Sequence, residues 1–271
     1  MQALSERLDA LLAGSSLAGF APLQFSAAKT FDPPADSLVG RTLDGVGRRG
    51  KYLIFDFGGP RLLIHLSQGG RIDVEQPPKT TRPKGAVLRL VFEERPSLLI
   101  KEYGTQRKAG WWVIPEGSEG PMEVLGPEPT SPEFEDFILH GTDRRRIHTI
   151  LRDQRTVAGI GRGYSDDILH RGRISPYTSL ASLTDDERRA LLDAIRFVLE
   201  EGLASERKRT GGLPPKLSGR FNVHGKAGQP CPRCGAELRR VSYEDYEIAY
   251  CPECQTEGRI LADRRLSRIV K

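Results

Sequence analysis

Four cysteines, arranged as two Cys-x-x-Cys pairs, constrain the fold of this chain more than any other feature. Cys231 and Cys234 form the first pair, Cys251 and Cys254 form the second, and 16 residues separate them. Two pairs at this spacing are typical of a four-thiolate zinc site. We expect one structural Zn²⁺, because four protein ligands leave no open coordination position for a reaction. The alternative is two redox-active pairs, but the thioredoxin-like βαβ pattern is missing around them.

The residues between the two pairs, Leu238 to Tyr250, are long enough for a β-hairpin that carries one pair at each end. Because all four cysteines belong to this motif, none remains for a disulfide, and we expect a reducing, cytoplasmic setting. No apolar run approaches the length of about 20 residues that a membrane span needs. The N-terminus shows no signal-peptide pattern.

A glycine-containing turn between two short helical runs is the second constraint. Val157–Gly161 forms an apolar turn between runs expected to be helical over residues 144–151 and 164–171. We expect Asp166 and Asp167 in the first turn of the second helix, where they would complement its dipole. A helix start beyond a tight turn also suits a phosphate. Spacing alone leaves a phosphate-backbone reader and a buried helical hairpin equally open.

Positive charge is concentrated in two parts of the chain. The stretch from Asp143 to Arg173 holds eight Lys/Arg against four Asp/Glu, and Ser205 to Lys271 holds 14 against 8. The formal net charge is +5. A basic C-terminal part on a near-neutral body is the pattern expected of a nucleic-acid binder. A solubility effect without a specific partner is the alternative.

Before these basic segments, the chain shows one helical run and then many short strands. Residues 3–13 have leucines at helical spacing, with Gly14 as a C-terminal cap. Six strand-like runs follow: Arg41–Val46, Lys51–Phe57, Arg61–Leu66, Ala86–Phe92, Ser97–Lys101 and Trp111–Ile114. Short strands close in sequence favour an antiparallel sandwich or barrel. Thr184 and Glu187 form a capping box for a later helix that reaches about Gly202.

The glycine turn resembles the helix–two-turns–helix of the formamidopyrimidine-DNA glycosylase/endonuclease VIII family, which binds DNA phosphates around a lesion. The matching residues are Asp153, Gln154, Val157, Ala158, Gly159, Gly161 and Tyr164, with Asp167 where the family usually has Glu. Arg162 stands where the family has a phosphate-binding Asn, and an arginine binds phosphate as a full charge. Phe221–Pro230 resembles the entry to the family's zinc hairpin. Tyr246 stands near the hairpin tip, where the family has a phosphate-gripping arginine.

The resemblance implies an α+β fold with an N-terminal antiparallel β-sandwich and a leading helix, a helical helix–two-turns–helix domain and a C-terminal zinc β-hairpin. We expect the sandwich domain over residues 1–115, a linker over 116–132, the DNA-binding domain over 133–220, the zinc finger over 221–256 and a basic tail over 257–271. Lesion choice is expected to depend on a pocket loop within Ser205–Ser218.

The resemblance also implies DNA contacts outside the glycine turn. Lys51 matches a strand-start lysine that contacts phosphate, although an ordinary strand lysine is the alternative. His65 begins a turn in which Gln68 replaces an intercalating methionine. Arg107 matches an arginine that fills the gap left by a flipped base, and Ala109 replaces its aromatic companion. With two wedges replaced, we expect a preference for bulged, nicked or single-stranded sites.

The six residues expected to contact DNA are Lys51, His65, Gln68, Arg107, Arg162 and Tyr164.

The family's chemistry needs an N-terminal proline, whose secondary amine attacks C1′ of the damaged nucleotide, and a glutamate directly after it. The printed sequence begins Met1-Gln2-Ala3, so we assign no catalytic residue. Glu6 is no substitute, because it lies a turn into the first helix. We favour a start codon placed a few codons too late over a degenerate member that binds damaged DNA without cutting it.

We therefore predict a base-excision-repair DNA glycosylase with AP lyase activity, acting as a monomer on damaged or abasic DNA with one bound Zn²⁺. A non-catalytic damaged-DNA-binding protein is the main alternative. A zinc-ribbon RNA-binding accessory protein is another, but it would not need the glycine-turn pattern.

Overall fold

The computed structural model describes residues 1–209, 221–243 and 246–262. Contacts within the chain divide it into two compact units. The first is centred on Met1–Val124, and the second on Leu125–Ser205 together with the described residues from Phe221 onward. None of the helices in the described residues is both long and apolar enough to cross a bilayer.

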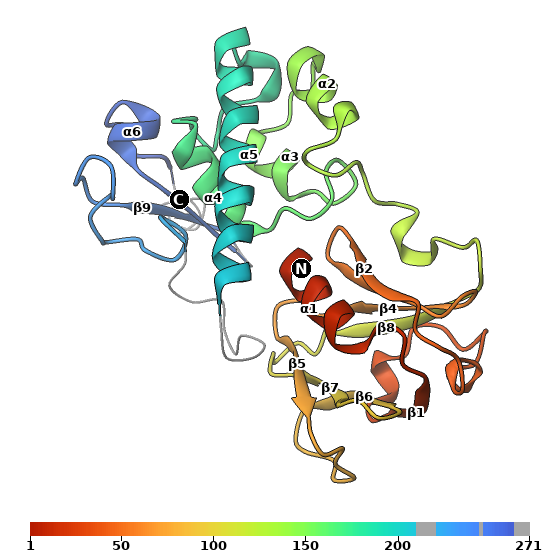
Figure 1. Cartoon of the computed structure of the whole chain (residues 1–271). Helices are drawn as coiled ribbons and strands as arrows, with labels where there is room; N and C mark the ends of the chain where they lie inside the picture. Colours follow the sequence, from red (N-terminus) through yellow and green to blue (C-terminus); the bar gives the residue numbers. More distant parts are fainter. Residues whose placement is uncertain (210–220, 244–245, 263–271) are drawn as a thin grey trace. The chain divides into compact units, whose positions relative to one another are not determined.

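The first unit consists of two four-stranded antiparallel sheets that share one apolar core (Figure 1). Its strands are β1 (Leu17–Pro22), β2 (Gly45–Arg49), β3 (Tyr52–Asp56), β4 (Arg61–His65), β5 (Gly70–Glu75), β6 (Ala86–Phe92), β7 (Ser97–Glu102) and β8 (Gly110–Ile114). The sheet orders are β1-β6-β7-β5 and β2-β3-β4-β8. Leu8 of the leading helix α1 (Gln2–Leu12), Leu53 of β3 and Leu98 of β7 belong to the same buried cluster. The predicted antiparallel sandwich with a leading helix is confirmed.

Two strands of the sandwich were not predicted, and one predicted strand was wrong. β1 contains Gly19 and Pro22, which are unfavourable within a strand, and β5 has only two apolar residues, Ile72 and Val74. The run Arg41–Val46 was expected to be a strand, but β2 begins at Gly45. Arg41 and Leu43 instead make irregular backbone hydrogen bonds with Leu17 and Ser15, so this segment is extended without belonging to a sheet ladder.

Among the residues that the structure describes, the second unit contains five α-helices and the two-stranded hairpin (Figure 1). Its elements are α2 (Pro132–His140), α3 (Ile147–Arg152), α4 (Arg162–Arg171), α5 (Asp185–Lys208), β9 (Arg239–Ser242), β10 (Glu247–Tyr250) and α6 (Pro252–Thr256). The capping box before α5 is present. Thr184 N donates to Glu187 Oε2 at 2.8 Å, and Glu187 N donates to Thr184 Oγ1 at 3.3 Å. The predicted hairpin between the cysteine pairs is also confirmed.

The two helices around the glycine turn begin at other residues than expected. α3 starts at Ile147, and α4 starts at Arg162. Asp166 and Asp167 therefore lie in the second turn of α4, and both are buried. Our prediction that they complement the helix dipole from its first turn was wrong, because the helix begins two residues earlier. Their role is described with the site.

Three short 3-10 turns connect elements of the first unit, η1 (Phe25–Ala27), η2 (Ala35–Leu38) and η3 (Gly120–Met122), and η4 (Leu180–Ser182) precedes α5. η3 lies in the expected linker over 116–132. Residues 210–218 of the predicted pocket loop and residues 263–271 of the predicted basic tail lie outside the described residues.

Candidate functional site

Three loops that carry predicted DNA contacts meet at one end of the sheet β2-β3-β4-β8. Strand register brings them together, because Tyr52 pairs with His65 across β3 and β4, and His65 pairs with Gly110 across β4 and β8. The turn that contains Lys51, the β4–β5 turn and the β7–β8 loop are therefore neighbours at this end. We name this end of the sheet the loop edge.

Gln68 and His65 differ in how they are placed at the loop edge. Gln68 is exposed in the turn between β4 and β5. His65 is half-buried, and its ring lies 4.9 Å from the ring of Tyr52. Burial, followed by the nearby Lys51 charge, lowers the pKa of His65. The His65 ring therefore packs on Tyr52 while Gln68 is exposed, and contact of either residue with DNA stays a prediction.

Arg107 lies on a loop that the buried carboxylate of Glu102 holds in place. Glu102 Oε1 accepts a hydrogen bond from Gly104 N, and Oε2 accepts one from Ala109 N, both at 2.8 Å. Tyr103 N donates to Gly69 O at 2.9 Å, which ties this loop to the β4–β5 turn. Arg107 is exposed, whereas Ala109 is 2% exposed. The Ala109 position therefore belongs to the base of the loop and cannot act as a wedge.

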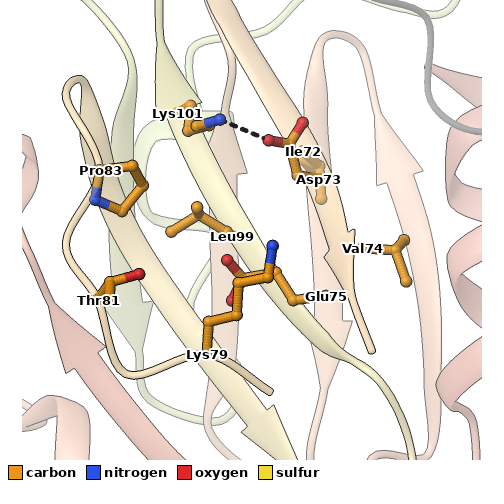
Figure 2. Close-up of a pocket in the computed structure, with 9 residues that line it drawn as sticks. All are labelled: Ile72, Asp73, Val74, Glu75, Lys79, Thr81, Pro83, Leu99 and Lys101. Atoms are coloured by element: carbon orange, nitrogen blue, oxygen red, sulfur yellow. Dashed lines mark hydrogen bonds and ion pairs between the residues drawn. The ribbon is translucent and has the colours of Figure 1, made fainter. Parts of the chain in front are cut away.

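A cavity of about 450 Å³ in the first unit is separate from these residues (Figure 2). It is lined by Ile72, Asp73, Val74, Glu75, Lys79, Thr81, Pro83, Leu99 and Lys101. Lys101 Nζ pairs with Asp73 Oδ2 at 2.7 Å, and Glu75 pairs with the buried Arg89 at 2.8 Å. Because these charges neutralise one another and no predicted contact lines the cavity, it is not the candidate site.

In the second unit, the glycine turn is locked by the side chain of Gln154. Gln154 Oε1 accepts from Gly159 N at 2.9 Å, and its amide donates to Ile160 O at 3.0 Å. Gly159 has φ 99°, a backbone conformation that favours glycine. Ala158 N donates to Pro127 O at 2.9 Å, so the segment before α2 packs on the turn. The turn is thereby fixed from both sides.

The turn ends at Gly161, which has an extended backbone, and α4 begins at Arg162. Arg162 is half-buried at this end. Tyr164 has a different environment, because its ring contacts Phe221 edge-on at 5.5 Å and packs against the second unit's core. The structure thus gives Tyr164 a packing role, and its contact with DNA stays a prediction.

The four cysteines converge as predicted. Their sulfur atoms all lie within 4.8 Å of one another. The structure adds a neighbour that sequence reasoning missed, because His170 Nε2 lies 3.2 Å from Cys231 Sγ. Arg233, inside the first pair, donates to His170 O at 2.9 Å and to Arg171 O at 3.1 Å. The first cysteine pair is therefore attached to the C-terminal end of α4.

Buried carboxylates in the middle of α4 hold the residues that lead into the hairpin. Asp167 accepts hydrogen bonds from Asn222 N at 2.7 Å and Val223 N at 3.0 Å. Asp166 Oδ2 lies 2.6 Å from His224 Nδ1 and accepts from Ala249 N at 3.2 Å. Both acids therefore dock the hairpin onto α4. The sequence signal for this role is their neighbouring positions on a helix, which by itself does not identify the partner.

Sequence reasoning also missed a group of aromatic and basic residues beside the N-terminus of α4. The rings of Tyr243 and Tyr246 stack with centroids 4.4 Å apart. The Arg152 guanidinium lies 3.7 Å from the Tyr246 ring centroid, and that of Arg162 lies 5.4 Å from it. Arg152 and Arg162 precede Tyr246 by 94 and 84 residues, so they give no local sequence pattern and only the folded chain brings them together.

Comparison with known proteins identifies two family domains along this chain. The formamidopyrimidine-DNA glycosylase N-terminal domain matches residues 2–112, and the formamidopyrimidine-DNA glycosylase H2TH domain matches residues 125–211. The formamidopyrimidine-DNA glycosylase of Thermus thermophilus is 34% identical over 234 residues, which is 81% of this chain and 84% of that protein. The formamidopyrimidine-DNA glycosylase of Chloroflexus aurantiacus is 30% identical, over 94% of this chain and 95% of its own length.

Solved structures of similar fold come from Lactococcus lactis. One is a formamidopyrimidine-DNA glycosylase bound non-covalently to DNA with an AP site, with a TM-score of 0.81 and 26% identity. Another is a complex with DNA containing N7-benzyl-Fapy-dG, with a TM-score of 0.82 and 26% identity. Each similarity covers 94% of this chain and 97% of the compared chain.

Proposed function

The chain belongs to the formamidopyrimidine-DNA glycosylase family, and on that premise we propose that it removes a lesion base from damaged DNA and nicks the resulting abasic strand. The observation that carries the proposal is the register of β3, β4 and β8. It brings Lys51, Gln68 and Arg107 to the loop edge. Lys51 and Arg107 match DNA contacts of the family, and Gln68 stands where the family has an intercalating methionine. The alternative of a damaged-DNA binder without catalysis is not favoured.

The loop edge supplies what extrusion of a damaged nucleotide needs. An exposed Gln68 and an exposed Arg107 can enter the space that a flipped nucleotide leaves in the stack. Lys51, on the adjacent turn, would pair with a phosphate beside that nucleotide. His65 would stabilise the β4–β5 turn, because its ring packs on Tyr52.

The second unit would bind the phosphate backbone through the start of α4. Backbone N–H groups and a partial positive charge at a helix N-terminus attract phosphate. Arg162 adds a full charge at that end. The locked glycine turn keeps this helix end from moving when DNA binds, so less conformational entropy is lost.

Zn²⁺ is the metal that the four cysteines fit best. A tetrahedral site with metal–sulfur bonds of about 2.3 Å has sulfur–sulfur edges of about 3.8 Å. The Cys231–Cys254 and Cys234–Cys251 sulfur distances are 3.9 and 3.5 Å. Four thiolates would close the coordination shell, so the ion would stabilise the hairpin and take no part in the reaction.

Borohydride trapping on an oligonucleotide with one abasic site tests the proposed activity, because only an enzyme that forms an imine with C1′ becomes covalently attached. The printed sequence is compared with a version that carries Met-Pro-Glu-Leu-Pro-Glu ahead of Gln2. We expect the proline version to be trapped and to nick the strand. Binding without trapping by both proteins would support the non-catalytic alternative, and no binding by either would overturn both. The predicted monomeric state is checked by the mass of the free protein in solution.

A further inference from the structure

The proposed zinc site has a neighbour on α4 that is not one of its four cysteines. His170 Nε2 lies 3.2 Å from Cys231 Sγ, and the two residues are buried, with 5% and 3% of their surface exposed. His170 belongs to the last turn of α4, whereas Cys231 follows 61 residues later in the chain. This histidine has no task in the proposed function.

His170 is placed beside the metal ligands and not among them. Among the described residues, the ligand atoms that lie close enough together to share an ion are the four cysteine sulfurs, all within 4.8 Å of one another, and His170 is not in this group. Four thiolates already complete a tetrahedral shell. The position of His170 is therefore that of a residue that contacts a ligand and leaves the ion to the sulfurs.

The location of the imidazole proton determines the direction of the bond to Cys231. A neutral histidine donates through one ring nitrogen and accepts through the other. A thiol could donate to Nε2, but a metal-bound thiolate has no proton and can only accept. Metal binding therefore selects the tautomer with its proton on Nε2, and the hydrogen bond runs from the imidazole N–H of His170 to the sulfur.

The burial of Cys231 explains why this sulfur needs donors from the protein. Zn²⁺ with four thiolates would keep two net negative charges, and buried charge is costly unless hydrogen-bond donors stabilise it. Cys234 is exposed and can receive hydrogen bonds from water, whereas Cys231 is buried. Cys231 Sγ accepts one hydrogen bond from Arg233 N at 3.4 Å, and His170 gives it a second, shorter one.

His170 is also held in place through its backbone. Arg233 Nη1 donates to His170 O at 2.9 Å, and Arg233 Nη2 donates to Arg171 O at 3.1 Å. These carbonyls lie in the last turn of α4, where a helix has no partner of its own for them, and the arginine charge complements the helix dipole. The loop between Cys231 and Cys234 therefore contacts both the backbone and the side chain of His170.

We propose that His170 is a positioning residue of the zinc site, which donates its Nε2–H to the Cys231 thiolate and couples metal binding to the folding of α4. The proposal rests on the zinc site of the proposed function and goes beyond it, because it assigns a residue outside the four ligands. Coupling between two equilibria is reciprocal. If an ordered α4 tightens the binding of the metal, the metal stabilises the C-terminal end of α4 by the same free energy.

The zinc affinity of full-length variants measures the strength of this bond. His170→Phe keeps a buried ring without a donor, and should weaken Zn²⁺ binding about 10- to 100-fold in competition with a chelator of known affinity. His170→Gln carries an amide N–H near the position of Nε2–H and should recover most of the affinity. His148→Phe is the matched control, because His148 is 2% exposed in the same unit and its Nδ1 lies 2.8 Å from Pro176 O. It should leave zinc affinity close to that of the wild type.

Co²⁺ in place of zinc separates the hydrogen bond from an effect of packing. An N–H donor withdraws charge from a thiolate, so its loss raises the energy of the sulfur lone pair. The sulfur-to-cobalt charge-transfer absorption should therefore move to longer wavelength in His170→Phe. It should stay in place in His170→Gln and in His148→Phe, because a change of packing alone leaves the charge on the sulfur unchanged.

NMR of the wild-type protein gives a test that does not depend on the folding of any variant. Nitrogen chemical shifts distinguish the two tautomers of a neutral imidazole, and the zinc-loaded protein should carry the His170 proton on Nε2. A proton on Nδ1 would overturn the proposal.

The remaining outcomes separate the role of His170 from the zinc site itself. Wild-type protein that binds neither Zn²⁺ nor Co²⁺ would overturn the zinc site, whereas borohydride trapping tests the proposed activity independently. Wild-type protein that binds metal, together with a His170→Phe variant of equal zinc affinity or unshifted absorption, would overturn only the role of His170. A His170→Gln variant that binds zinc as weakly as His170→Phe would do the same.

Discussion

Glu102 is the residue on which the shape of the loop edge depends most directly. Its buried carboxylate accepts one hydrogen bond from each end of the loop that carries Arg107. A backbone N–H that loses a buried acceptor costs about 1–3 kcal/mol. We expect Glu102→Ala to lower the free energy of unfolding by that order and to weaken binding to duplex abasic DNA, with Glu102→Gln between it and the wild type.

Denaturant titration and fluorescence anisotropy measure the two effects of Glu102→Ala. Glu119→Ala is a suitable control, because Glu119 pairs with Arg61 at the surface and its side chain is 54% exposed. Equal duplex affinity for wild type and Glu102→Ala would show that the loop keeps its shape without the carboxylate.

Gln68 gives a second prediction at the scale of single residues. It is exposed in a turn at the loop edge, where an apolar side chain could enter the base stack. We expect Gln68→Met to raise the affinity for duplex abasic DNA relative to the same lesion in a single strand, because the methionine repays part of the unstacking cost. Competition between the two oligonucleotides measures this ratio. The hypothesis of a single-strand preference would be wrong if the wild type already binds the duplex more tightly.

At the scale of elements, the contact between α4 and Phe221, which leads into the hairpin, leaves no room for a larger side chain at Gly163. A Cβ placed on Gly163 would lie 2.3 Å from the ring of Phe221, whereas one on Gly172 would find only ordinary contacts at 3.4 Å or more. We expect Gly163→Ala to destabilise the second unit by about 1–3 kcal/mol, as overpacking does. Gly172→Ala should be close to neutral. Chemical denaturation of the zinc-loaded proteins tells the two apart, and an equally mild Gly163→Ala would mean that Phe221 can move.

The contact between Asp166 of α4 and His224 makes the stability of the second unit depend on pH. The hydrogen bond to Asp166 raises the pKa of His224 above its ordinary value near 6.5, and burial raises the pKa of Asp166. A folded-state pKa above the unfolded one stabilises the fold below the unfolded pKa, and this stability is lost as pH rises through the folded pKa. The same sign holds for Asp166, whose pKa is also raised in the folded state. Replacing His224 alone therefore isolates the contribution of the histidine.

We expect wild-type protein to be more stable than His224→Asn at pH 6, with the difference shrinking toward pH 8.5 as His224 loses its proton. Unfolding by urea at constant zinc measures the difference at each pH. His140→Asn is the control, because His140 is 73% exposed and pairs with the exposed Asp136. A difference that grows with pH would contradict the assignment of the protonated histidine as the stabilising form.

At the scale of the whole molecule, each unit has its own apolar core, but the hairpin has very little. The sandwich and the helices each bury a large cluster. In the described residues, the hairpin cluster consists of Val223, Leu238, Cys231 and Cys251, with Ala236 and Cys254 packed against it. A structural zinc site contributes about 10–16 kcal/mol of apparent binding free energy in small zinc domains. We therefore expect the hairpin to depend on the metal.

We predict one zinc per chain and two calorimetric transitions. A chelator should lower the midpoint of the transition of the second unit, leave that of the sandwich in place and abolish binding to abasic DNA. Cys234→Ser should have the same effect without the chelator. A chelated protein that keeps both transitions and its DNA affinity would show that the hairpin folds without the ion.

Several features of this protein depend on short stretches of sequence and were predicted from them. The cysteine spacing predicted that four thiols converge, and they do. Thr184 and Glu187 identified the start of α5, and the glycine turn placed two helices around it. These signals are readable because each depends on residues a few positions apart, whose geometry is fixed by backbone stereochemistry.

Other features depended on the tertiary structure, because they join residues that are distant in the chain. The loops that carry Lys51, Gln68 and Arg107 become neighbours only through the register of β3, β4 and β8. Asp166 looked like a dipole partner and is instead a buried acceptor for the hairpin. Arg152 and Tyr246 are far apart in the chain, and only the fold brings the guanidinium to 3.7 Å from the ring centroid. Long-range packing and register leave no local pattern, so the sequence determined the parts of this protein and the fold decided which of them act together.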